Sequence, residues 1–245
     1  LQCRSAFATL DYSYFIAANS KRFGQTPLVR LCDDGAYRLT DEFRSMLEQT
    51  TFRMFFTDTV EAGLFNALAL AESSRKHHIR QNHGFLYGEK YSVFDVMRLC
   101  GWPAEQVPQN VGGYKLDTET GSLPIFIKYE ASQYGDRFLN PGEIEWFSKN
   151  NRSLKSNEFR WLLDGTERTP EWQNRHFVPI FIRRKAEEQE KSYYFVGNAV
   201  ALDDVRASVN PGEDGSESKV VISTLKLDKP VDPELYRHLT GKSAL

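Results

Sequence analysis

Leu123-Pro-Ile-Phe-Ile-Lys-Tyr129 is a run of apolar and aromatic residues with a proline near its start, and Phe177-Val-Pro-Ile-Phe-Ile-Arg183 repeats this pattern. Such residues favour strands, and proline is tolerated where a strand begins or lies at a sheet edge. Both runs are therefore predicted as strands, and further strands are predicted over 111–116, 192–198 and 218–227. Since regular strand–helix–strand alternation and a Gly-rich phosphate loop are absent from the sequence, we expect a small curved or closed β-sheet rather than a nucleotide-binding fold.

The first third of the sequence has the pattern of helices. A helix is predicted from Thr40 or Asp41, with Leu39, Phe43, Met46 and Leu47 on one face. A second is predicted over 58–76, where Asp58 and Glu61 form a capping-box pair. Short β-like runs flank the turn at Asp33-Asp34-Gly35. We therefore predict an α+β chain, with a helical, winged-helix-like unit over residues 1–88 and a β-rich unit over 89–245.

Helices and one loop are also predicted within the β-rich unit. Ser92 and Asp95 form a capping box that predicts a helix over 93–99, and Asp232-Pro233 predicts the start of a last short helix. Asn140-Pro-Gly-Glu143 is predicted to start a helix that carries Trp146 and Phe147. The polar, acidic segment 203–219 is predicted as a loop.

The composition is that of an ordinary folded protein. Of the 245 residues, 40% are hydrophobic, and 31 Lys and Arg residues nearly balance 33 Asp and Glu residues. No apolar run approaches the roughly 18 residues of a membrane helix, so no membrane partner is expected. Three cysteines exclude a disulfide framework and suit a reducing compartment. Because the sequence starts at Leu1 rather than methionine, we expect a piece of a longer protein.

The sequence contains no convincing catalytic or metal-binding pattern. His77, His78 and His83 lack a nearby cysteine and are interpreted as a polar helix end. Cys100 has apolar neighbours and is interpreted as a core residue. No Gly-x-Ser-x-Gly motif occurs, and the carboxylate pairs lie in polar surroundings. We therefore expect no enzyme activity, no metal and no cofactor in this chain.

The segment 145–161 interleaves cations with short polar side chains, inside a stretch (149–185) that is rich in basic residues. Hydroxyl and amide side chains beside cations are the usual contacts to nucleic-acid phosphates. The predicted phosphate contacts are Ser148, Lys149, Arg152, Lys155 and Ser156. Trp146, Phe147 and Trp161 flank them, and aromatic side chains in this position stack on bases. The alternative is a core helix with a solvated outer face.

Four stretches together carry a family resemblance. They are Tyr91-Ser-Val-Phe-Asp-Val-Met-Arg-Leu-Cys-Gly-Trp102; Leu123–Tyr129; Tyr134-Gly-Asp-Arg-Phe-Leu-Asn140 followed by Trp146-Phe-Ser-Lys-Asn-Asn-Arg-Ser-Leu-Lys-Ser156; and Tyr193-Tyr-Phe-Val-Gly197 with 225–236. In this order they resemble the C-terminal domain of bacterial superfamily II helicases, many of which also carry a phospholipase-D-like nuclease domain. Among these are type IV restriction enzymes that cut DNA containing methylated cytosine. The resemblance covers most of residues 20–240.

The resemblance implies a cytoplasmic bacterial protein of a restriction system that acts in antiviral defence. Its C-terminal part is similar to the SRA/PUA class of β-barrels, so the implied fold is a small SRA/PUA-like barrel that recognises the target. The implied partners are double-stranded DNA containing modified cytosine, such as 5-methylcytosine, and helicase and nuclease domains of the same polypeptide. Asn150 and Asn151 depart from the family, in which serine and arginine are common there. Leu123 stands where a small polar residue is frequent.

A base-reading role implies base flipping, which requires aromatic faces and an acceptor for the N4 amino group of cytosine. We predict a base pocket of Tyr129, Tyr134, Asp136 and Trp146, because Tyr134 and Asp136 lie in a turn that leads towards Trp146. The alternative for these aromatic residues is that they fill the core of the barrel. The alternative function is a scaffold domain that couples helicase to nuclease without reading bases.

Overall fold

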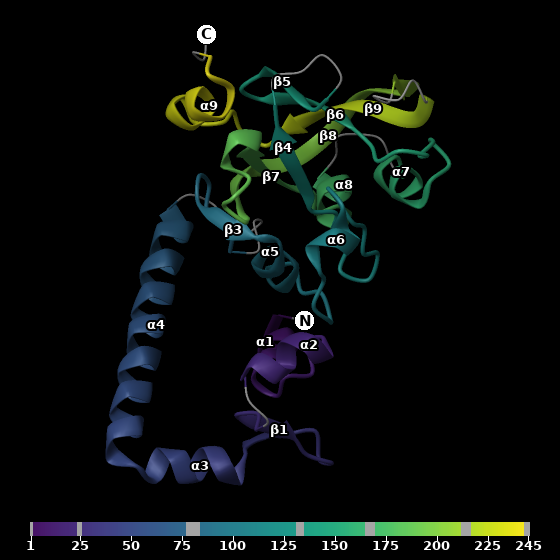
Figure 1. The fold of residues 1–245 in the computed structure, drawn as a ribbon. Helices are drawn as coiled ribbons and strands as arrows, with labels where there is room; N and C mark the ends of the chain where they lie inside the picture. The colour runs from purple at the N-terminus through teal and green to yellow at the C-terminus, as the bar shows by residue number, and fades with distance from the viewer. Residues whose placement is uncertain are drawn as a thin grey trace. The chain divides into compact units, whose positions relative to one another are not determined.

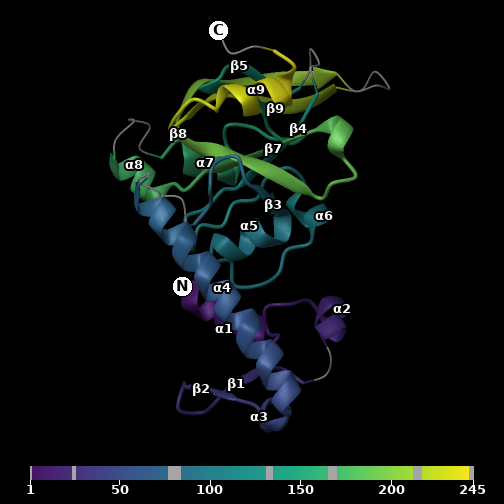
Figure 2. The same cartoon turned by 90° about the vertical axis from the view of Figure 1, so that its left-hand side faces the viewer.

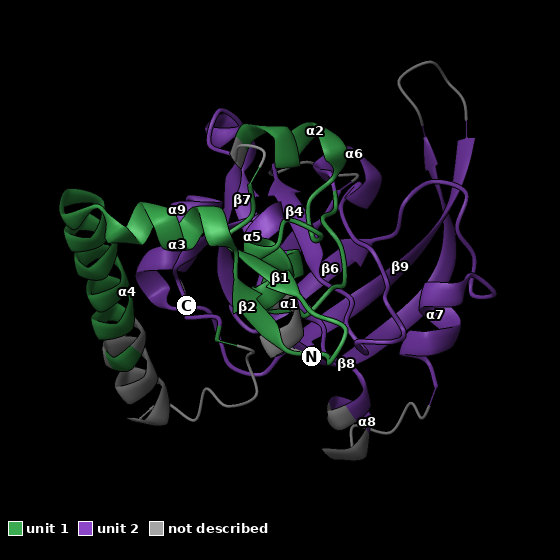
Figure 3. Cartoon of the chain, turned by 90° about the horizontal axis from the view of Figure 1, so that it is seen from below, with its two compact units in different colours: residues 1–84, 97–106 green, residues 85–96, 107–245 purple. Residues whose placement is uncertain are grey.

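The computed structural model describes residues 2–23, 26–76, 84–130, 135–164, 170–211 and 217–242. The chain divides into two compact units, shown in green and purple in Figure 3. Unit 1 contains Leu1–Gly84 and Met97–Gln106, and unit 2 contains Phe85–Val96 and Val107–Leu245. The sequence places a single boundary between residues 88 and 89, whereas the chain returns to unit 1 for residues 97–106.

Unit 1 is built from helices and a hairpin. Its elements are α1 (Gln2–Leu10), α2 (Ala17–Ser20), η1 (Lys21–Phe23), the antiparallel strands β1 (Val29–Leu31) and β2 (Tyr37–Leu39), α3 (Asp41–Glu48) and α4 (Thr50–Lys76). Thr40 is the N-cap of α3, as predicted, and its hydroxyl accepts a hydrogen bond from the Phe43 N–H. The predicted helix 58–76 begins earlier, at Thr50, because Phe52 and Phe56 pack on Phe43. The winged-helix likeness is not shown by this arrangement.

Unit 2 is organised by a seven-stranded sheet (Figure 1). Its strands are β3 (Lys90–Ser92), β4 (Ile125–Tyr129), β5 (Arg137–Asn140), β6 (Glu143–Phe147), β7 (Pro179–Arg184), β8 (Ser192–Pro211) and β9 (Glu217–Leu227). They pair in the order β4-β7-β8-β9-β6-β5, and β3 pairs with the first residues of β8. Only the β4–β7 pair is parallel among the strand pairs of the described residues. In this part of the chain β4 and β5 do not pair with each other, so the curled sheet is a half-barrel and not a closed barrel.

Short helices accompany the sheet. They are α5 (Val93–Leu99), α6 (Pro108–Val111), α7 (Asn157–Leu162), α8 (Pro170–Arg175), η3 (Lys185–Glu187) and α9 (Pro233–Thr240). Two predicted helix starts are confirmed. Ser92 Oγ accepts from the Asp95 N–H, and Asp232 accepts from the Glu234 N–H. In Figure 2 the long strand β8 crosses the unit and α9 lies near β5, where the Tyr236 and Phe138 rings are 5.1 Å apart.

The main core of unit 2 lies between the sheet and its helices. Ile125, Ile127, Ile180 and Ile182 contribute to it from the two parallel strands, and each is at most 1% exposed. Trp146 of β6 packs between Tyr114 and Phe159, at centroid distances of 5.0 and 5.8 Å. This core fixes the end of β6 against α7. Residues 148–156, which we call the basic segment, start at that point.

The helix predicted from Asn140 is wrong, because residues 137–147 form the β5–β6 hairpin. Asn140 Oδ1 accepts from the Gly142 N–H at 2.9 Å and closes the turn, an arrangement that competes with a helix N-cap. The side chains that follow alternate with a period of two, which is a strand pattern: Ile144 and Trp146 are core residues, and Glu145 lies on the opposite face.

Two further expectations are corrected. Residues 111–116 include the end of α6 and form only an isolated bridge, Tyr114 to Ile125, instead of a strand. The predicted loop 203–219 is mostly strand, since β8 and β9 pair from Ala199–Leu227 to Pro211–Glu217. Backbone hydrogen bonds hold this hairpin together. Because its side chains are mostly polar, the sequence shows no alternation of apolar residues that would reveal the two strands. Residues 212–216 lie outside the described residues.

Candidate nucleic-acid interface

The basic segment leaves β6 and runs beside β9 before it enters α7. Ser148 makes two hydrogen bonds with this strand: its backbone N–H donates to Val221 O at 2.9 Å, and its side-chain hydroxyl accepts from the Val221 N–H at 2.8 Å. The Arg152 N–H donates to Lys219 O at 3.2 Å. The segment is therefore held at its start by hydrogen bonds to β9, and Ser148 is buried in making them.

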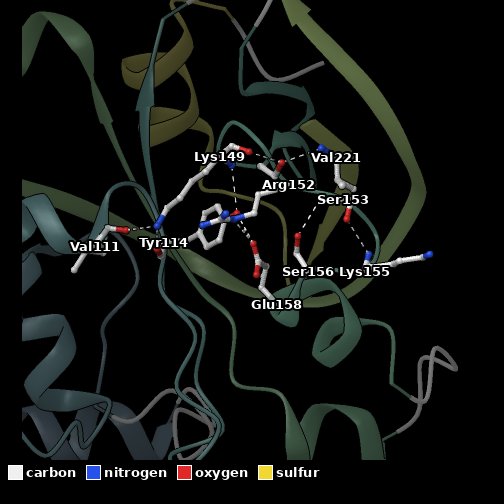
Figure 4. Close-up of polar contacts among 10 residues, drawn as sticks. Val111, Tyr114, Lys149, Arg152, Ser153, Lys155, Ser156, Glu158 and Val221 are labelled. Carbon is white, nitrogen blue, oxygen red and sulfur yellow. Dashed lines mark hydrogen bonds and ion pairs between the residues drawn. The ribbon is translucent and has the colours of Figure 1, made fainter. Parts of the chain in front are cut away.

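Lys149 points into the protein. Its ammonium group donates to the carbonyl oxygens of Val111 and Tyr114, at 2.7 Å each, and lies 4.5 Å from the centre of the Tyr114 ring (Figure 4). Burial lowers the pKa of Lys149, and the charge of Arg152 acts in the same direction. This geometry favours a structural role, while the predicted phosphate contact of Lys149 stays a prediction.

We expect Lys149→Met to lower the free energy of unfolding of unit 2 by about 1–3 kcal/mol, because two carbonyl oxygens lose their donor. Urea denaturation followed by tryptophan fluorescence measures this change. The matched variant is Lys155→Met, which removes an exposed ammonium group from the same segment and is expected to leave stability unchanged within about 0.5 kcal/mol. Equal stabilities of the two variants would contradict the structural role of Lys149.

Arg152 is held by an ion pair and is half-exposed. Its Nε lies 2.9 Å from Glu158 Oε1, and the same carboxylate accepts from the Tyr114 hydroxyl at 3.0 Å. Burial is the main cause of the raised pKa of Tyr114, so this phenol stays a donor. The guanidinium group is thus positioned by one acid while 40% of its side chain remains accessible.

Lys155 is the freest cation of the segment. Its side chain is exposed, has no partner among the residues that the structure describes, and extends away from the Lys149–Glu158 network in Figure 4. Ser156 is the N-cap residue of α7, and its hydroxyl accepts from the Ser153 N–H at 3.0 Å. Ser148 and Ser156 thus shape the backbone, and the half-exposed Arg152 and the exposed Lys155 project from it.

The residues predicted from the sequence do not include the basic residues that other strands supply. Lys219 of β9 is exposed, and its carbonyl contacts Arg152. Arg137 of β5 and Arg206 of β8 bind the two oxygens of the buried Glu145 carboxylate, at 2.8 and 3.0 Å. No local pattern reveals these residues, because only the sheet register brings them beside β6.

The predicted base-pocket residues do not form one open group among the described residues. Trp146 is 2% exposed and Tyr129 is 7% exposed, so both contribute to the core. Tyr129 packs on Phe138, at 5.7 Å between ring centres, and borders a hollow of about 520 Å³ with Arg184 and Leu239. Tyr134 lies outside the described residues. The pocket assignment therefore stays a prediction.

Asp136 has unusual surroundings for an acid. Its Oδ1 accepts from the Phe147 N–H at 2.8 Å, at the junction of β6 and the basic segment. Burial raises the pKa of Asp136 to about 7, and this hydrogen bond only partly opposes the effect. Near neutral pH the group is therefore part carboxylic acid and part carboxylate, and its carboxyl oxygens can accept a hydrogen bond from an amino group in either form.

Family models match both parts of the chain. The model described as a domain of unknown function (DUF3427) matches residues 85–239, more than half of the chain. The chain belongs to the DUF3427 family. The match lies mostly in unit 2 and includes the sheet, the basic segment and α7. A second model, also described as a domain of unknown function (DUF8090), matches residues 1–71. No curated protein matches the sequence.

Solved structures similar to the DUF3427 chain include three that contain DNA recognition domains. The DNA recognition domain of the cytosine modification-dependent restriction endonuclease LpnPI is 12% identical, with a TM-score of 0.40 over 66% of this chain and 90% of that one. The SUVH5 SRA domain with fully methylated CG DNA is 11% identical, with a TM-score of 0.37 over 61% and 94%. The sulfur-binding and SRA domains of ScoMcrA with phosphorothioated DNA are 14% identical, with a TM-score of 0.35 over 64% and 47%. At these TM-scores the likeness assigns no function.

None of the helices placed by the structure is both long and apolar enough to cross a membrane. Among the described residues, no three His, Cys, Asp or Glu side chains are grouped so that they could hold a metal ion. His77, His78 and His83 lie outside the described part of the chain.

Proposed function

We propose that the DUF3427 domain binds double-stranded DNA and reads modified cytosine, as the target-recognition part of a type IV restriction enzyme. The observation that carries this proposal is the cationic edge formed by Arg152, Lys155 and Lys219, where a hydrogen bond joins the basic segment to β9 and the cations are half-exposed or exposed. Preorganised cations beside short polar side chains suit phosphate oxygens. The family resemblance of the sequence supplies the modified cytosine and the enzyme class.

In this proposal the cationic edge fixes the register of the domain on DNA, and an extruded base is read in a pocket. Flipping a base costs a few kcal/mol of unstacking, which stacking and edge hydrogen bonds must recover. The buried 5-methyl group contributes only about 1 kcal/mol, so pocket shape carries much of the discrimination. Tyr129, Tyr134, Asp136 and Trp146 remain the sequence-based prediction for that pocket. Helicase and nuclease activities would belong to other parts of the polypeptide.

We expect Lys155→Ala and Lys219→Ala each to weaken binding to methylated and unmethylated duplexes alike. Each lost phosphate contact reduces the slope of log K against log salt by about one. Fluorescence anisotropy titrations of labelled duplexes at several salt concentrations measure both quantities.

The matched control is Lys191→Ala. Lys191 is also exposed, but it lies just before the first residue of β8, whereas Lys219 pairs with Val209 near the last residue of that strand. This variant should retain the wild-type salt slope. If all three variants keep the wild-type slope, DNA does not bind at the cationic edge. If one of the first two alters methyl preference but leaves unmethylated binding intact, its role as a phosphate contact is wrong.

A scaffold that couples helicase to nuclease is the second candidate, and one observation in unit 1 favours it. Helix α4 exposes large apolar side chains, among them Phe55 at 70% and Phe65 at 72%. Exposed apolar groups of this size are typical of protein-binding surfaces. The same titration separates the two candidates, because a scaffold binds neither duplex in a salt-dependent, methyl-dependent manner.

A further inference from the structure

A polar hollow of about 670 Å³ lies beside the cationic edge, between α7 and the turn at residues 116–118. We call it the Trp161 pocket. Its walls include Trp161, Asn157 and Arg160 from α7, and Asp117 from the turn. A volume of this size accommodates a nucleotide. The sequence-based base pocket includes none of these residues.

Trp161 is the aromatic wall of the pocket, and the buried His176 packs against its ring. The ring of the buried His176 lies 4.4 Å from the Trp161 ring and is stacked 4.4 Å from the Trp172 ring. His176 Nε2 also lies 2.7 Å from the carbonyl oxygen of Trp161, and Nδ1 lies 2.7 Å from that of Trp172. Trp161 is therefore a preorganised and only partly buried face, which is what base stacking requires.

The polar groups of the pocket are arranged around this face. Asp117 Oδ2 accepts from the N–H and the hydroxyl of Thr120, at 3.1 and 2.6 Å, which orients the carboxylate. The second oxygen, Oδ1, has no partner among the residues that the structure describes. Asn157 Oδ1 accepts from Arg160 at 2.6 Å, so the amide NH₂ of Asn157 keeps its donors. The pocket thus offers an oriented acceptor, a donor and a cation.

We propose that the Trp161 pocket holds the extruded base, and that it selects bases with an exocyclic amino group. The base stacks on Trp161, Asp117 accepts a hydrogen bond from the amino group, and Arg160 lies within the pocket as a partner for the flanking phosphate. Lys155 directly precedes Ser156, the N-cap of α7, and Arg160 lies within α7, so the same short stretch of chain supplies a phosphate contact and a wall of the pocket. The inference rests on the proposed function and names the site at which that function reads DNA.

The variants Trp161→Ala, Trp161→Phe and Asp117→Asn test the pocket in the full 245-residue chain. The probes are three duplexes of one sequence, with cytosine, 5-methylcytosine or thymine opposite one guanine. Loss of stacking is expected to lower the affinity of Trp161→Ala for the 5-methylcytosine duplex about tenfold, to the level of unmodified DNA. Trp161→Phe keeps most of the affinity. Asp117→Asn retains the Thr120 contacts and is expected to lose the preference for 5-methylcytosine over thymine.

Folding and the two proposals are distinguished within the same experiment. Thermal melting monitors the fold, and Asp117→Asn and Trp161→Phe keep the test decisive if Trp161→Ala is unstable. If Asp117→Asn and Trp161→Ala both keep the wild-type base preference while Lys155→Ala still weakens binding, the assignment of the base to the Trp161 pocket is wrong and the proposed DNA binding stands. If Asp136→Asn alone abolishes the preference, the base is read at Asp136. A wild-type chain that binds none of the duplexes overturns both proposals.

Discussion

Gly197→Ala is expected to lower the free energy of unfolding of unit 2 by about 3 kcal/mol or more, because backbone strain and lost hydrogen bonds act together. Gly197 has a φ of +132°, which a residue with a side chain rarely adopts. A Cβ built there would lie 2.6 Å from Asp228 Oδ1 and 3.3 Å from the Tyr87 ring. The close approach to Asp228 requires that the protein shift.

Asp228 cannot shift without losing contacts. Its oxygens accept from the Asn198 N–H at 3.1 Å, the Asn198 side-chain amide at 3.3 Å and the Lys229 N–H at 3.0 Å, and the Tyr87 hydroxyl also donates to it. Urea denaturation of Gly197→Ala measures the cost. The control is Gly142→Ala in the same unit, where the nearest atom to a new Cβ lies at 3.5 Å and φ is not positive. Similar losses in both variants would show that Gly197 is not special.

Asp136→Asn is expected to change the free energy of unfolding more favourably at pH 8 than at pH 4. The difference between the two pH values is expected to reach up to about 4 kcal/mol. The asparagine retains an acceptor for the Phe147 N–H and removes the cost of burying a charge. Denaturation at a series of pH values measures the difference between variant and wild type. The structural reason is the raised pKa of Asp136, about 7 against 3.8 for an ordinary aspartate.

The sign follows from proton linkage. Between about pH 4 and pH 7 the unfolded chain has lost the Asp136 proton while the folded chain keeps it, so wild-type stability falls as the pH rises through this window. Above the folded pKa the loss is complete. A pH-independent Asp136→Asn effect would contradict the raised pKa.

The sequence predicts elements well where local chemistry decides them. Thr40, Ser92 and Asp232 cap helices because their side chains bond to N–H groups two or three residues ahead. The strands predicted over 123–129 and 177–183 are observed as β4 and β7, and their largely apolar residues reveal them because a strand buried on both faces requires such residues. Asn140-Pro141 misleads, because the same residues that begin helices also close β-turns.

The candidate site is harder to predict because its parts meet only in the folded chain. The pattern 148–156 predicts a set of cations for phosphate contacts, yet it does not reveal that the ammonium group of Lys149 donates to two carbonyl oxygens inside the protein. Lys219 joins the cationic edge only through the pairing of residues 148–152 with β9. Asp117 and Trp161 line the same hollow although they are distant in sequence, and neither residue carries a local signal of the other.

The single long strand β8 has a consequence for how unit 2 folds. It pairs with β3 and β7 through its first part and with β9 through its second part. Neither half of the sheet can therefore be completed before β8 is in place. The partners are distant along the chain: Lys90 pairs with Tyr194, and Glu143 pairs with Lys226. Such non-local pairings slow folding, since loops must close before contacts form. On a ribosome, β4 and the β5–β6 hairpin would emerge before their partners β7 and β9, and the sheet would be complete only once residue 227 has been released.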